Sequence, residues 1–126
     1  MLPVLPLKSV LLVNAISSAA TGVLLVFLAN PIADLFGVPQ TNPFNQAGIF
    51  LLVFAGLVFI TSLQQPINVN ALRFIILLDA LWVIASLVLL LFLGSSISTI
   101  GIVAILAVAA WVAMMALLQR IGLRSL

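Results

Sequence analysis

Asp79 is the one acidic side chain within the long apolar segments of this sequence, and it is the group best suited to chemistry. It lies in residues 73–94, which are almost all apolar and long enough to cross the ~30 Å hydrocarbon core of a bilayer. A charged side chain there costs about 2.5–3.5 kcal/mol to insert, so it is expected to face a partner or a cavity. Asp79 is therefore either a titrating group on a proton or ion path or a polar clasp that fixes helix register.

A small set of polar residues within the apolar segments could act together with Asp79: Asn14, Ser18, Thr21 and Ser86. A structural clasp needs only one of them, such as the Asn14 amide, or a backbone group as its hydrogen-bond partner. Transport needs polar groups that continue across the membrane, and beyond these four the chain offers few. Both hypotheses remain open from the sequence.

Residue types that are absent exclude most other chemistry. The chain has no Cys, His or Tyr, and its only carboxylates are Asp34 and Asp79. Thiol catalysis and thiolate metal sites are excluded, and the commonest general base and metal ligand is missing. The sequence contains no basic patch of the kind that binds nucleic acid. We therefore expect neither an enzyme nor a metal site or cofactor.

Composition places the whole chain in lipid. Of its 126 residues, 66% are hydrophobic and 5% charged, where soluble domains have roughly 45–50% and about 25%. Small residues at Ser17–Ala20 resemble a signal-peptide cleavage region, but the apolar run continues to Leu28 and predicts a retained span. We predict an all-α membrane protein, a single-domain bundle of four transmembrane helices, with spans at about 8–29, 44–64, 71–93 and 98–118.

The connections carry helix start and stop signals. Asn30 followed by Pro31 predicts an N-cap and first helical position, and Gly37 predicts the end of a short helix over 31–36. We expect this short helix to lie in the membrane interface, with an irregular loop as the alternative. Asn68 or Asn70 is expected to cap the third span, residues 94–96 to form a tight turn, and residues 119–126 to form a short basic tail.

The basic residues predict the orientation. All of them fall at the N-terminus, the second loop or the C-terminus, which a four-span topology places on one side: Lys8, Arg73, Arg120 and Arg124. The first and third loops contain no Lys or Arg. The positive-inside rule therefore predicts that both termini are cytoplasmic.

An internal repeat relates the first span to the third. A shift of 65 residues aligns Lys8 with Arg73 and Asn14 with Asp79, which predicts two parallel helical-hairpin repeats. Asn14 and Asp79 each lie six residues from the aligned cation, hence at equal depth, about 9 Å from the boundary. If the two spans are neighbours, the Asn14 amide can donate to the Asp79 carboxyl. Gln119 or Arg120 could also reach inward from the fourth span.

Small and aromatic residues predict where the helices pack together or meet a partner. Gly22 lies on a small, polar stripe of the first span, and Ala109 and Ala113 lie on an alanine-rich face of the fourth. Trp82 and Trp111 lie inside spans rather than in the interfacial belt. We expect both indoles to be buried in the bundle or against a partner, with a pigment or quinone contact as the alternative.

The segment from Asp79 through Trp82 and Ser86, with the Asn14 region and residues 31–39, resembles an uncharacterised family of small four-span membrane proteins. This resemblance implies a four-helix bundle from a bacterium or cyanobacterium, in the inner or thylakoid membrane, and no known activity. We expect a non-catalytic accessory or structural subunit that contacts membrane lipids and other transmembrane subunits or copies of itself. The alternatives are a small transporter or ion-conducting oligomer using Asp79, and a lipid- or pigment-binding accessory protein.

Overall fold

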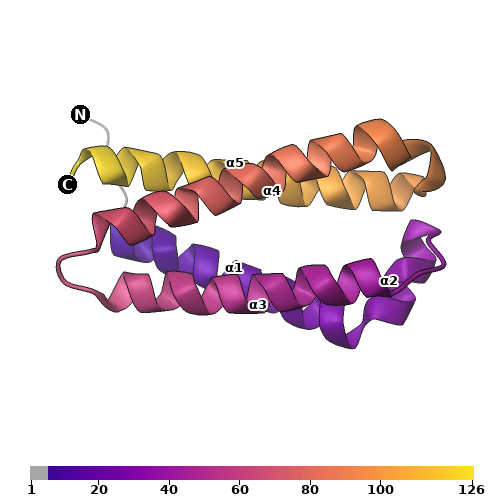
Figure 1. The fold of residues 1–126 in the computed structure, drawn as a ribbon, viewed down its shortest axis with the longest axis horizontal. Coiled ribbons are helices and arrows are strands. Elements are labelled where there is room, and N and C mark those ends of the chain that lie inside the picture. Colours follow the sequence, from indigo (N-terminus) through magenta and orange to yellow (C-terminus); the bar gives the residue numbers. More distant parts are fainter. Residues whose placement is uncertain (1–5) are drawn as a thin grey trace.

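A computed structural model describes residues 6–126, and this part of the chain is a bundle of four long helices with no strand (Figure 1). A short helix, α2, lies in the first connection, and a single 3₁₀ turn, η1, lies in the third. The predicted all-α four-helix fold is confirmed. The elements in chain order are α1 (Leu7–Phe27), α2 (Ala29–Phe36), α3 (Asn42–Leu63), α4 (Val69–Leu93), η1 (Gly94–Ser96) and α5 (Thr99–Arg124).

The four long helices are each long and apolar enough to cross a membrane. Large apolar side chains point outward along them, and Phe27, Leu91 and Phe92 are each at least 75% exposed. Such a surface is stable only when lipid surrounds it. The chain is therefore a multi-pass membrane protein.

Helix α5 continues to Arg124, beyond the predicted end of the fourth span near residue 118. Gly122 lies against the side chain of Leu7, where an added Cβ would come within 2.6 Å of Leu7 Cδ1. Arg124 lies in the last turn, where a cation interacts favourably with the helix dipole. The expected basic tail is thus the last part of the helix.

In the first connection, the short helix α2 begins earlier than predicted. The first span ends at Phe27, and α2 already begins at Ala29, with Leu28 between the two helices. Asn30 is therefore inside α2 and is not its N-cap, and the prediction of that cap was wrong. Gly37 ends α2 in the left-handed region at φ 70° and its N–H bonds back to the last turn, as predicted from the sequence.

Two later helix starts follow their capping side chains. Asn68 accepts a hydrogen bond from the backbone N–H of Ala71 at 3.2 Å and caps α4, one of the two caps predicted. Ser98 accepts from the N–H of Gly101 at 3.1 Å and caps α5. Each cap satisfies an otherwise free amide of the first helical turn.

The bundle consists of two closely packed helix pairs, α1 with α3 and α4 with α5, and the backbones of α3 and α4 approach each other less closely than those within a pair (Figure 1). Gly22 and Gly48 allow α1 and α3 to approach closely, because a Cβ added to either would lie 2.9 Å from the other's carbonyl oxygen. The pairs are joined at one end by a buried apolar cluster: Leu11, Ala15, Phe54, Val58, Leu72 and Ile75.

All four cations lie at that same end. The start of α1, the α3–α4 connection and the end of α5 meet there, and α2 and η1 lie at the opposite end (Figure 1). We call the first the basic end and the second the far end. Asp34, in α2, is the one charged residue at the far end.

Candidate functional site: a polar clasp and an apolar cavity

Three polar side chains from three helices meet near the basic end, and we call Asn14, Asp79 and Gln119 the polar clasp. The Asn14 Nδ2 group donates to Asp79 Oδ2 at 3.0 Å and to Gln119 Oε1 at 2.7 Å. Gln119 Nε2 donates to the same Asp79 oxygen at 2.8 Å. All three residues are at most 3% exposed. The clasp therefore links α1, α4 and α5 in the interior of the bundle.

Equal depth along the first and third spans accounts for the Asn14–Asp79 contact, and the predicted hydrogen bond is confirmed. Ser18 joins from one turn further along α1, where its hydroxyl donates to Asn14 Oδ1 at 3.2 Å. Gln119 completes the group, and Arg120 is exposed. Buried polar groups whose hydrogen-bonding capacity is used in this way hold helices in register at little cost.

Thr21 and Ser86 lie outside the clasp. Each hydroxyl donates to the backbone carbonyl four residues earlier in its own helix, Ser17 and Trp82 respectively. Of the five polar residues predicted to act together, the structure thus brings together Asp79, Asn14 and Ser18. The other two line an apolar cavity on the far side of Trp82.

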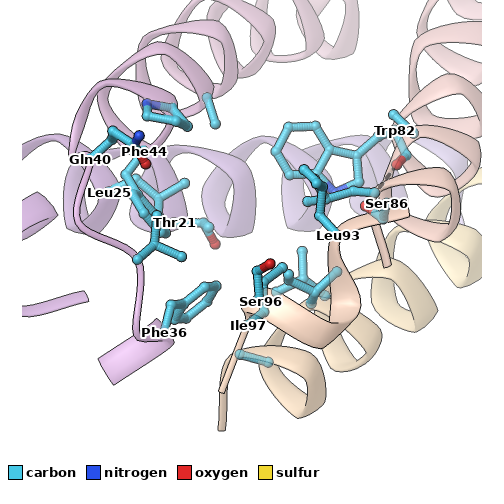
Figure 2. Close-up of a pocket in the computed structure, with 18 of the residues that line it drawn as sticks. Thr21, Leu25, Phe36, Gln40, Phe44, Trp82, Ser86, Leu93, Ser96 and Ile97 are labelled. Atoms are coloured by element: carbon cyan, nitrogen blue, oxygen red, sulfur yellow. Dashed lines mark hydrogen bonds between the residues drawn. The ribbon is translucent and has the colours of Figure 1, made fainter. Parts of the chain in front are cut away.

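This cavity lies between the two helix pairs and has a volume of about 540 Å³ (Figure 2). Figure 2 shows Leu25 and Phe44 across the cavity from Trp82 and Leu93, and Ser96 and Ile97 at its end. Its walls come from every long helix and from both far-end connections: Thr21, Leu25, Phe36, Val38, Pro39, Gln40, Pro43, Phe44, Ala47, Trp82, Ala85, Ser86, Leu89, Leu93, Ser96, Ile97, Ala104, Ile105 and Val108.

The cavity suits a hydrocarbon chain. Pockets that bind small ligands measure about 300–1,000 Å³, and this one lies within that range. Within the described residues its wall contains no charged side chain, and the few polar ones include the hydroxyls of Thr21 and Ser86, which are already bonded to backbone. From Leu93 to Trp82 the cavity follows eleven residues of α4, about 16 Å of helix rise and half of a bilayer core.

Aromatic rings lie between the cavity and the polar clasp. Trp82 stacks on Phe50 with ring centroids 6.1 Å apart, and Phe50 stacks on Phe54 at the same distance. Behind the rings, Asp79 and Ser18 face a space of only about 10 Å³. The clasp and the cavity are therefore separate features of the interior.

The two tryptophans, predicted to be buried in the bundle or against a partner, lie in different surroundings. Trp82 is half-buried at the cavity wall, and its indole N–H is shielded but has no hydrogen-bond partner within residues 6–126. Trp111 is 40% exposed on the bundle surface, and its indole N–H donates to Ser17 Oγ at 3.1 Å. Trp111 is therefore not buried within this chain, and its burial against a partner stays a prediction.

The predicted packing residues also divide into buried and outward-facing ones. Gly22 and Ala109 are buried by other helices of this chain, and Ala113 faces outward. Close packing of α1 on α3 through Gly22 explains why the residue must be small. Of the predicted packing faces, only Ala113 and Trp111 remain on the outside for a partner.

The sequence indicated Gln119 and Arg120 as alternatives that could reach inward and did not decide between them, and it did not reveal the cavity. The signal for Gln119 was its spacing from Met115 and Gly122, which share one helix face and are also buried. The cavity left no comparable signal, because its wall residues are apolar like those facing lipid.

Comparisons of this chain with protein-family models, with curated proteins and with solved structures found no match. The resemblance to small four-span bacterial membrane proteins therefore stays a prediction.

Proposed function

We propose that this protein is a non-catalytic integral membrane protein that binds one hydrocarbon chain of a lipid in the cavity between its two helix pairs. The observation that carries the proposal is the 540 Å³ apolar cavity, which is walled by all four long helices. Its depth matches about one leaflet, since α4 rises ~16 Å between Trp82 and Leu93.

Packing supplies the binding free energy in this setting. A chain that moves from bilayer to cavity gains no hydrophobic free energy, because both surroundings are apolar. It gains dispersion contacts with wall atoms that an empty cavity would leave without partners. Rigid walls such as Phe36 and Trp82 can therefore select a chain by shape.

The arrangement of polar groups supports ligand binding over ion conduction. The clasp residues bond mainly to one another, and the stacked rings of Phe50 and Trp82 lie between Asp79 and the cavity. Between those rings and the far-end residues Gln40 and Ser96, the hydroxyls on the described cavity wall are those of Thr21 and Ser86, which are bonded to their own helices. A transport path would need polar groups that continue to the far end.

The role of accessory subunit in a larger complex, or in a homo-oligomer, is retained as the setting in which the bound lipid would act. Ala113 and Trp111 form the outward part of the predicted packing faces and would make such a contact. We place the protein in a bacterial inner membrane, or in a thylakoid membrane if the source is cyanobacterial, with the basic end on the cytoplasmic side. The clustering of Lys8 and the three arginines at one end supports this orientation.

Native mass spectrometry after mild detergent extraction tests the proposed function. We expect one lipid molecule per chain, and we expect Ala104→Phe, which fills the cavity, to release it. Ala113→Phe adds the same ring on the outer surface of the same helix and is the matched control. Equal lipid occupancy in the two variants would contradict the proposal. Proteins that migrate with the chain on a native gel would identify its complex.

Orientation has an independent test, because the chain contains no cysteine. A single cysteine at exposed Ser125 should react with a membrane-impermeant maleimide only from the cytoplasmic side. A cysteine at exposed Ser96, at the far end, should react only from the opposite side. The reverse pattern would contradict the proposed topology.

A further inference from the structure

Among residues 6–126, none places a positive charge at the far end of the cavity, where a lipid head group would sit. Gln40 and Ser96 are exposed and reach the cavity from the two far-end connections, and both are neutral. Arg73 lies twenty residues from Leu93 along α4, about 30 Å by helix rise. Lys8, Arg120 and Arg124 lie at the same basic end as Arg73.

Asp34 gives the far end a negative charge. It is exposed in α2, two residues before the cavity-lining Phe36. Phosphate groups are normally bound by arginine, lysine or a helix N-terminus. The side chains at this end of the cavity offer an amide and a hydroxyl, which suit neutral hydrogen-bonding groups.

Toward the basic end, Trp82 lies between the cavity and a much smaller space beside the clasp. Asp79 and Ser18 lie behind the rings of Trp82 and Phe50, and the space between them is about 10 Å³. A ligand in the cavity can therefore direct its chain toward Trp82 and its head group toward Gln40 and Ser96.

We infer that the cavity selects an uncharged lipid, one whose head group carries hydroxyl or carbonyl groups, over an anionic phospholipid. This inference rests on the proposed function and adds the class of ligand. Gln40 and Ser96 would contact the head group, and Leu89, Leu93 and Trp82 would contact the chain.

Trp82 provides the readout for a direct test. The chain has two tryptophans, so Trp111→Phe leaves Trp82, in the cavity wall, as the single indole. The variant is reconstituted into phosphatidylcholine vesicles that contain either brominated diacylglycerol or brominated phosphatidylglycerol with identical chains. Bromine quenches indole fluorescence only at short range. The same titrations with Ala104→Phe added measure quenching by lipid outside the cavity.

We expect diacylglycerol to quench Trp82 at about fivefold lower mole fraction than phosphatidylglycerol, which corresponds to ~1 kcal/mol. Replacing both Gln40→Leu and Ser96→Ala should remove this preference while chain binding persists. Equal quenching by the two lipids, abolished by Ala104→Phe, would overturn the inference and leave the proposed function standing. Quenching that Ala104→Phe leaves unchanged for both lipids would overturn the proposed function as well.

Discussion

Replacing Gln119 by leucine removes one member of the polar clasp without changing side-chain volume greatly. The change deletes the hydrogen bond from Asn14 at 2.7 Å and the hydrogen bond to Asp79 at 2.8 Å. Asn14 and Asp79 are buried, at 2% and 3% exposure, and they keep their mutual hydrogen bond. Asn14 also keeps the bond that it accepts from Ser18.

The expected loss in the free energy of unfolding has two parts: the deleted hydrogen bonds, and a buried amide hydrogen that is left without a partner. Hydrogen bonds between membrane helices contribute about 0.6 kcal/mol on average, so two of them give about 1.2 kcal/mol. An amide hydrogen left buried without a partner adds about 1–2 kcal/mol. We therefore predict that Gln119→Leu lowers the free energy of unfolding by about 2–3 kcal/mol.

Reversible unfolding in mixed micelles of increasing dodecyl sulfate content measures this loss. Gln46→Leu is the matched control, since Gln46 is exposed in the first turns of α3. The double variant Asn14→Leu with Gln119→Leu should lose less free energy of unfolding than the two single variants lose together. The reason is that each single variant already loses the Asn14–Gln119 hydrogen bond, so the sum counts this bond twice. Losses that add to within about 0.5 kcal/mol, or a Gln119→Leu effect equal to that of the control, would refute the clasp.

Three further predictions concern packing, capping and the chemistry of the acid. Gly22→Val should destabilise the protein by about 1–3 kcal/mol because its Cβ meets the backbone of α3, whereas Gly56→Val, in open space, should have little effect in the same unfolding assay. Ser98→Ala should cost about 1–2 kcal/mol through its lost cap and its lost bond to α2, measured against Ser95→Ala, whose side chain is exposed. Asp79→Asn keeps an acceptor oxygen, so it should fold with a loss below about 1 kcal/mol and leave proton flux into vesicles unchanged. Reduced flux would instead favour the ion-site hypothesis.

The sequence was sufficient for the fold because membrane helices are specified by simple rules. Long apolar runs predicted four spans, and the polar residues of those runs predicted the Asn14–Asp79 contact, since few other partners are available in lipid. The cap at Asn68 and the stop at Gly37 followed from local backbone chemistry that needs no tertiary information. These features depend on residue type and spacing alone.

Features that depend on how the helices pack were not predictable. Ser18 lies one turn from Asn14 and bonds to it, whereas Thr21 and Ser86 lie seven residues beyond Asn14 and Asp79, about 10 Å by helix rise, and bond to the backbone of their own helices. The cavity is invisible in the sequence because Leu25 and Leu93 are as apolar as the residues that face lipid. The sequence left open whether Trp111 faces the bundle or a partner, because an apolar span has no polar face that marks the outside.

The two ends of the bundle differ in how they hold the helix pairs together, and this difference supports the direction of ligand entry. At the basic end, the buried apolar cluster, the clasp and the contact of Leu7 with Gly122 join the pairs. At the far end, the described contacts between the pairs centre on Ser98, which bonds to the last turn of α2, and on Phe36 against Gly101. A lipid chain that enters from the far end would displace few of these contacts, and the clasp would remain intact. Replacing Asn14 or Gln119 should therefore lower stability without changing which lipid is bound, whereas Gln40 and Ser96 should affect lipid selection and hardly affect stability.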